Sequence, residues 1–184
     1  DVPLDPAYRF GRLPNGMRYI IRPNATPKGE VAVRMEVAAG SLDESDAERG
    51  YAHYVEHMAF QGSKHVPPGE MVRELERLGL AFGADTNAQT YFDRTTYLFD
   101  LPRNDPALID KALMLMRETA GELTFPAAET KRELGVVLSE KRDRNSWSYR
   151  ALESRLDFMA PGARYTNRMP IGTTEALSAA TPKT

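Results

Sequence analysis

The chain has 184 residues, and its 26 acidic and 24 basic side chains leave a formal net charge of −2. That balance and the absence of a long basic run argue against nucleic acid as a partner, and no apolar stretch is long enough to span a membrane. The chain contains no cysteine, so disulfides and thiolate chemistry are excluded, and any metal ligands must be His, Asp or Glu. The length suits one globular domain.

The first predicted elements are two strands. Residues 17–22 (MRYIIR) follow a Pro-Asn-Gly turn, and Val31–Val37 (VAVRMEV) places apolar residues at alternate positions, as a half-buried strand does. We expect the two strands to pair as an antiparallel hairpin across the polar loop 24–29.

Two helices are predicted next. The first covers about 51–60, with Ser45 or Asp46 as its N-terminal cap and Gly62 at its end. The residues expected on its buried face are Ala52, Val55 and Ala59. The second helix covers about 67–78 and opens with two prolines.

The second half of the chain is predicted to hold two more strands and three helices. The expected ranges are an edge strand or irregular segment at 82–90, a strand at 94–101, helices at 105–122, 126–144 and 149–158, and a loop-like tail at 160–184. Hairpin strands among helices favour an α+β fold, a mostly antiparallel sheet packed against helices, over a parallel βαβ sheet.

The helix at 51–60 carries the motif His53-x-x-Glu56-His57. Residues four apart on a helix share one face, so the two imidazoles can bind one metal ion, with Glu56 beside them to accept a proton from water. This is the inverted form of the better-known H-E-x-x-H order. The alternative is a pair of partly exposed histidines with Glu56 as a salt-bridge partner, and the pattern favours the metal site.

A catalytic zinc site needs a third protein ligand, and the segment ELGVVLSE supplies two candidates. Glu133 and Glu140 are seven residues apart and share a helix face, so one could reach the metal while the other steadies a ligand. Spacing alone does not choose between them. The third histidine, His65, lies in a proline-flanked loop, where we expect it to be solvated.

The run GYAHYVEHMAFQGS at 50–63 resembles the signature of the pitrilysin-type, or inverzincin, metallopeptidases of family M16. That superfamily includes insulin-degrading enzyme and the mitochondrial processing peptidase. Further segments that match it are LPNGMRY at 13–19, NAQT at 87–90, TTY at 95–97, ELGVVLSE at 133–140 and PIG at 170–172. The resemblance covers nearly the whole chain, and within the family it points to the long bacterial probable zinc proteases.

The resemblance implies a zinc-dependent endopeptidase that hydrolyses peptides or small unfolded proteins. One Zn²⁺ would be held by His53, His57 and Glu140, with Glu56 as the general base and Glu133 in a supporting catalytic role. It also implies that the peptide substrate adds as an extended edge strand. The implied substrate contacts are Phe60, Asn87 and Ala88.

The resemblance further implies that residues 1–184 form a single N-terminal catalytic domain that stops before its last helix and strand. The implied partners are the remaining domains of the same protein or a partner half, and the fragment alone is expected to be weakly active or inactive. The long bacterial members suggest the periplasm, with the cytoplasm as the alternative. A non-catalytic interaction subunit is the rival function, and a quorum-signal lyase, which uses a cysteine, is disfavoured.

Overall fold

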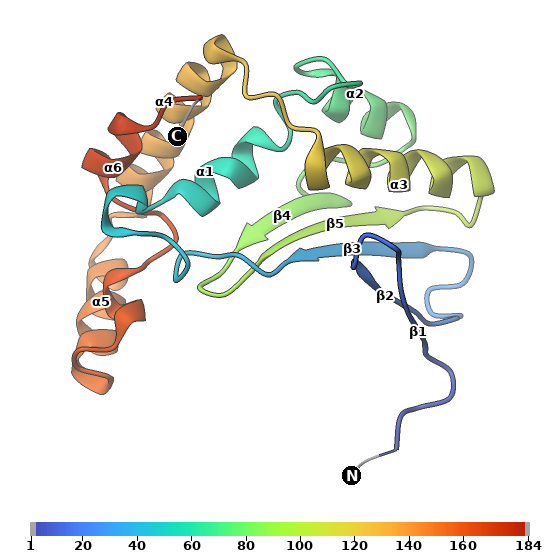
Figure 1. The fold of residues 1–184 in the computed structure, drawn as a ribbon, viewed down its shortest axis with the longest axis horizontal. Helices are drawn as coiled ribbons and strands as arrows, with labels where there is room; N and C mark the ends of the chain where they lie inside the picture. Colours follow the sequence, from blue (N-terminus) through green and yellow to red (C-terminus); the bar gives the residue numbers. More distant parts are fainter. Residues whose placement is uncertain (1–2, 183–184) are drawn as a thin grey trace.

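The computed structural model describes residues 3–182 and centres on a three-stranded antiparallel sheet (Figure 1). The strands are β3 (Val31–Val37), β5 (Thr95–Leu101) and β4 (Thr86–Thr90), in the order β3-β5-β4. In the register, Val33 pairs with Phe99 and Ala88 pairs with Tyr97. The predicted α+β class with an antiparallel sheet is confirmed. For residues 82–90 the sequence predicted an edge strand or an irregular segment, and β4 is an edge strand.

The main core lies between this sheet and helices on one of its faces. Alternate residues of β5 are buried, which turns Tyr97, Phe99 and Leu101 toward α2 (Glu70–Arg77) and α3 (Pro106–Gly121). Figure 1 shows α1, α2 and α3 together on this side of the sheet. Complete burial of such side chains contributes about 1.5–3 kcal/mol each, which fixes the sheet against the helices.

A second, smaller core joins α1 (Tyr51–Met58), α4 (Ala127–Arg144) and α6 (Thr174–Ala179). Its buried members are Tyr54, Met58, Val137 and Leu177. The predicted inward face of α1 is therefore partly wrong. Ala59 is buried, but Val55 is 39% exposed, because the neighbour of α1 is α4 as well as the sheet.

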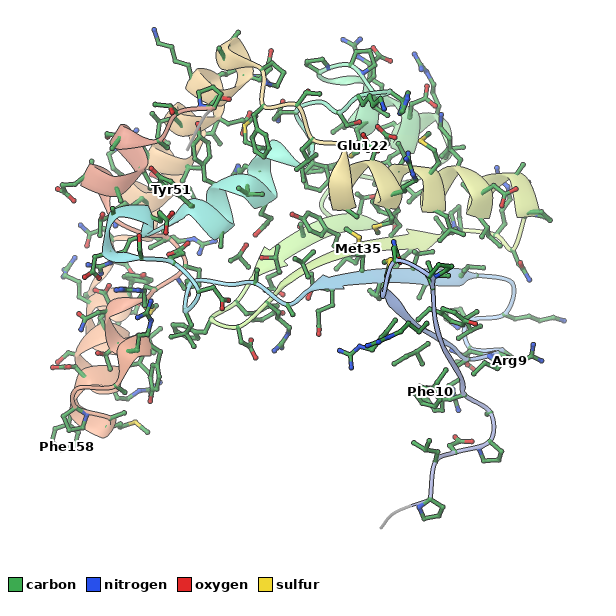
Figure 2. All side chains as sticks on the ribbon, viewed as in Figure 1. Arg9, Phe10, Met35, Tyr51, Glu122 and Phe158 are labelled. Carbon is green, nitrogen blue, oxygen red and sulfur yellow. The ribbon has the colours of Figure 1, made fainter. Side chains whose placement is uncertain are left out.

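The predicted hairpin of residues 17–22 with Val31–Val37 is wrong. β2 (Arg18–Ile21) pairs instead with β1 (Arg9–Arg12), and β3 pairs with β5. The turn between β1 and β2 is built by Gly16, which has a φ of +90°, and by Asn15, whose Oδ1 accepts the N–H of Met17 at 3.1 Å. Figure 2 shows Phe10 on this hairpin, away from the helical layer, and it is 52% exposed.

The tail predicted as a loop contains the 3₁₀ helix η2 (Arg164–Asn167) and the helix α6. The Thr173 hydroxyl caps α6 by accepting the N–H of Ala176 at 3.2 Å, and Ile171 and Leu177 are buried. Pro170 and Gly172 before this six-residue helix and Pro182 after it read as loop residues, and six residues are too few to show a helical period. The expected domain limits, residues 1 and 184, lie outside the described residues.

Other boundaries follow the predictions with local shifts. Ser45 caps the 3₁₀ helix η1 (Asp46–Glu48) rather than α1, whose N-cap is Gly50. The second helix begins at Glu70, and the predicted helix at 149–158 is α5 (Trp147–Met159), which extends away from the sheet in Figure 1. Within residues 3–182, no helix combines the length and hydropathy needed to cross a bilayer.

Candidate metal centre

The N-terminus of α1 is fixed by a carboxylate and by close backbone packing. Glu44 accepts the N–H groups of Gly50 at 2.9 Å and of Ala52 at 2.8 Å, which satisfies donors that a helix start leaves unpaired. Gly50, with a φ of +103°, packs against Gly172, where a β-carbon would come within 2.4 Å of the Gly50 backbone. Lys141 Nζ on α4 donates to the carbonyl of Gly172 at 2.6 Å. The 170–173 loop thus ties the start of α1 to α4.

His53 and His57 lie one turn apart on α1, with ring centroids 4.8 Å apart and planes at 86°. Glu140 on α4 meets both rings. Its Oε2 is 3.5 Å from His53 Nε2 and 3.3 Å from His57 Nε2. All three residues offer a ligand atom within 4.8 Å of the others. The structure therefore brings Glu140, rather than Glu133, to the face that the two imidazoles share.

This spacing fits zinc. Ligand atoms placed tetrahedrally at about 2.0–2.2 Å from Zn²⁺ lie roughly 3.3 Å from one another, close to the two Glu140–imidazole distances. Two neutral imidazoles and a carboxylate are also a ligand set known from catalytic zinc sites. The expected cofactor is consistent with the residues present.

Glu133 lies on the opposite side of the His57 ring from Glu140. Its Oε2 is 3.3 Å from His57 Nδ1, the nitrogen opposite the one that faces Glu140, and the residue is 7% exposed. A carboxylate on the outer nitrogen of a metal-binding histidine fixes the ring orientation and tautomer. This position agrees with the supporting role that was predicted for Glu133, and the role itself stays a prediction.

The electrostatics of His53 and Glu140 favour the protonation states that metal ligands need, whereas His57 is held toward its protonated form. Burial, reinforced by His57, lowers the pKa of His53 to about 4, so this imidazole is neutral at pH 7. The hydrogen bond with His57 is the main cause that lowers the pKa of Glu140 to about 2. Burial lowers the pKa of His57, but hydrogen bonds to Glu140 and Glu133 outweigh it and raise that pKa overall. A cation would replace the proton that His57 shares with these carboxylates.

Glu56 lies beside the candidate metal ligands and has a partner on the sheet. Its Oε2 accepts a hydrogen bond of 2.5 Å from Thr90 Oγ1, at the end of β4. Burial raises the pKa of Glu56 above its usual range, because it outweighs the Thr90 hydroxyl and His57, which lower that pKa. Glu56 is thus placed next to the candidate metal centre without belonging to the ligand group.

The predicted substrate contacts lie on β4 and, in the case of Phe60, two residues beyond the end of α1. The Ala88 N–H turns to Asn87 Oδ1 at 2.9 Å. Phe60 is 8% exposed, packs in the main core and meets Phe82 edge-on at 5.2 Å between ring centroids. Their roles as substrate contacts stay predictions.

Two residues near the site were not assigned from sequence, Thr90 and Arg144. Arg144 pairs with Oε1 of Glu140, the oxygen that faces away from the histidines. The i,i+4 spacing on α4 was the signal for this contact. For Thr90, the alternation along β4 was the signal, since Ala88 and Thr90 share a face.

His65 is exposed, as predicted, but it has a buried partner. Its Nδ1 is 2.8 Å from Oε1 of Glu118, a carboxylate 1% exposed. The same carboxylate accepts a hydrogen bond from Ser63 Oγ at 2.7 Å.

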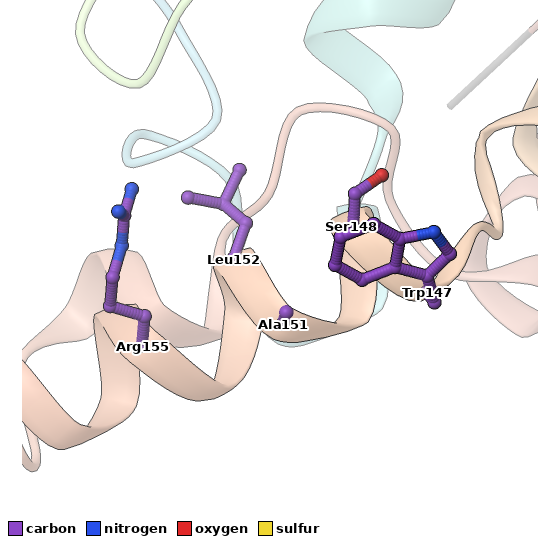
Figure 3. Close-up of a pocket in the computed structure, with 5 residues that line it drawn as sticks. All are labelled: Trp147, Ser148, Ala151, Leu152 and Arg155. Atoms are coloured by element: carbon purple, nitrogen blue, oxygen red, sulfur yellow. The ribbon is translucent and has the colours of Figure 1, made fainter.

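A separate hollow lies along α5 (Figure 3), lined by Trp147, Ser148, Ala151, Leu152 and Arg155. It includes none of the metal-centre residues.

Comparison with known protein families identifies one model over most of the chain. Residues 19–161 match the insulinase family, peptidase family M16. The chain is 35% identical to the probable zinc protease PqqL of Escherichia coli over 181 residues, which are 98% of this chain and 19% of that relative. It is 36% identical to the probable zinc protease PqqL of Haemophilus influenzae over 183 residues, all of this chain and 20% of that relative.

Solved structures show the same similarity. The first half of the periplasmic protease PqqL from Escherichia coli superposes with a TM-score of 0.95 at 35% identity, covering 99% of this chain and 39% of that one. Pitrilysin gives a TM-score of 0.75 at 24% identity, covering 94% of this chain and 18% of that one, which bears on the fold alone. The chain thus spans about a fifth of the length of the PqqL relatives.

Proposed function

The chain belongs to the insulinase family of peptidases, M16, and on this premise we propose that it is the zinc-binding catalytic domain of an endopeptidase. The observation that carries the proposal is the convergence of His53 Nε2, His57 Nε2 and Glu140 Oε2 next to Glu56. A non-catalytic interaction subunit is less well supported, because it has no need for this complete set of groups.

In the proposed reaction, His53, His57 and Glu140 hold the zinc ion. The chemistry that zinc supplies when bound is Lewis-acid activation of the peptide carbonyl and of water. Glu133 keeps the His57 ring oriented through Nδ1, at 3.3 Å. Glu56 accepts the proton of the attacking water on a carboxylate oxygen and passes it to the leaving amine.

We propose that the substrate is a peptide, or a small unfolded protein, in extended form. β4 pairs only with β5 among the described strands, so no strand covers its other edge; the Ala88 N–H bonds the Asn87 side chain and would exchange that bond for one to an added peptide. Main-chain pairing to such an edge binds an extended peptide with little demand on its sequence. This edge runs to Thr90, which contacts Glu56, so a bound strand would lie beside the general base.

We also propose that this domain works within a longer polypeptide or with a partner half that completes the substrate chamber. Its similarity to one fifth of the PqqL relatives supports this organisation. The periplasmic location given for Escherichia coli PqqL supports the same compartment here.

The test compares Glu56→Gln with wild type in the full-length protein, using zinc content and cleavage of an unstructured peptide as readouts. We expect the variant to keep one zinc per domain and to lose cleavage by roughly 100-fold or more, because general-base catalysis contributes about that much. Glu76→Gln, an exposed glutamate on α2, is the matched control and should cleave like wild type. Unchanged turnover in metal-loaded Glu56→Gln would contradict the proposed role.

A further inference from the structure

The contact between Thr90 and Glu56 joins two elements far apart in sequence. Thr90 Oγ1 donates to Glu56 Oε2 across 34 residues, and both side chains are partly buried. The proposed function assigns the proton transfer to Glu56 and gives no role to Thr90. This hydroxyl is a hydrogen-bond partner of the Glu56 carboxylate.

The position of the hydroxyl is set by the sheet. Thr90 is the last residue of β4 and pairs with Thr95, a buried residue at the start of β5. On a strand, alternate residues share a face, which puts Thr86, Ala88 and Thr90 on one side of β4. A β-branched side chain has few rotamers, so the Thr90 hydroxyl is held in place before any substrate binds.

Glu56 has a longer and more flexible side chain than Thr90. The hydrogen bond to Oε2 restricts its rotation and leaves Oε1 without this donor. A proton-accepting oxygen has to lie within hydrogen-bond reach of the water it deprotonates, so a fixed carboxylate is a better base than a mobile one.

We propose that Thr90 is a positioning residue for the general base: its hydroxyl fixes one oxygen of Glu56 so that the other accepts the proton of the attacking water. The inference rests on the proposed function and deepens it. Because Ala88 and Thr90 are two residues apart, about 7 Å along a strand, the edge that would hold the peptide also orients the base.

The matched control lies on the same face of the same strand. Thr86 is fully buried, and within the described part of the chain its hydroxyl has no hydrogen-bond partner. Thr86→Val and Thr90→Val therefore make the same chemical change, and only the second removes a contact with Glu56. Thr90→Ser keeps the hydroxyl and removes a methyl group.

The experiment measures kcat, KM, zinc content and thermal stability of these three variants in full-length protein with an unstructured peptide. We expect Thr90→Val to lower kcat about tenfold or more, with KM within about twofold of wild type and full zinc content. Thr90→Ser should recover most of the lost kcat, and Thr86→Val should match wild type.

Several results would overturn the inference. Wild-type kcat in Thr90→Val would refute it and leave the proposed function intact, as would an equal loss of kcat in Thr86→Val and Thr90→Val. Loss of zinc from Thr90→Val, or failure of Thr90→Ser to recover kcat, would show a structural role instead. Absence of cleavage by zinc-loaded wild type would overturn both the proposed function and the inference.

Discussion

Replacing Val137 by Ala tests whether packing between α1 and α4 maintains the candidate metal centre. Val137 is fully buried and packs in the small core with Tyr54, Met58 and Leu177. It lies on α4 between Glu133, which contacts His57, and Glu140, which faces both histidines. A looser contact here should reduce both the stability of the fold and the affinity for zinc.

The magnitude can be worked from the two methyl groups removed. Their burial is worth about 0.8 kcal/mol each, and the remaining cavity adds to the loss. Alanine is the better helix former by up to about 0.7 kcal/mol, which offsets part of it. We therefore expect Val137→Ala to lower the free energy of unfolding by about 1–2 kcal/mol, and Tm by roughly 2–8 °C in a chain of this size.

The assay is urea unfolding of the metal-free chain, followed by zinc titration against a competing chelator. The control is Val136→Ala, because Val136 is on the same helix but 46% exposed. That variant should show unchanged or slightly higher stability from helix propensity alone. Equal midpoints for Val136→Ala and Val137→Ala would refute the reasoning. Loss of stability without any loss of zinc affinity would separate the fold from the site.

Two further predictions concern the carboxylates. Glu140→Ala should abolish stoichiometric zinc binding, whereas Glu133→Gln should still bind zinc, about 10–100-fold more weakly, because the proposed function makes Glu140 a ligand and Glu133 the residue that orients His57; equal affinities by chelator competition would contradict these proposed roles. Burial raises the pKa of Glu118, but hydrogen bonds from His65 and Ser63 outweigh it and lower the pKa to about 2 from the usual 4.5. A lowered carboxylate pKa stabilises the fold above the unfolded-state value, so the stability difference between wild type and Glu118→Gln should be full above pH 4.5 and shrink toward pH 2. Urea midpoints of the metal-free wild type and Glu118→Gln at pH 6 and pH 3 measure this stability difference. The same difference at both pH values would contradict a lowered pKa of Glu118.

The elements that could be predicted from sequence are those with a long local period. β3 (VAVRMEV) places apolar residues at alternate positions, β5 (TTYLFDL) is rich in the threonine and aromatic residues that favour strands, and α3 and α4 are 16 and 18 residues long. β1 was missed because four residues with the sequence RFGR carry no alternation to detect. The wrong pairing of β2 with β3 has a different cause. Which strands pair depends on contacts between distant residues, and β3 finds β5 more than 50 residues later.

The site shows the same division between local and distant information. Helical spacing alone placed His53, Glu56 and His57 on one helix, since that geometry is local. Local spacing could not choose between Glu133 and Glu140, because both lie on one face of α4. The way α4 packs against α1 decides which of them reaches the side that the two imidazoles share. Family resemblance pointed to Glu140, and the distances of 3.3 and 3.5 Å to the imidazoles agree with it.

The tail matters to the candidate metal centre even though it contributes none of the candidate ligands. Its Gly172 packs against Gly50 at the start of α1 and accepts Lys141 Nζ of α4, and Leu177 fills the core between the same two helices. His53 and His57 belong to α1 and Glu140 to α4, so the relative position of these helices sets the distances among the candidate ligands. A segment that looks irregular in sequence therefore helps to set the geometry of the candidate metal centre, because it contacts both helices that carry the candidate ligands.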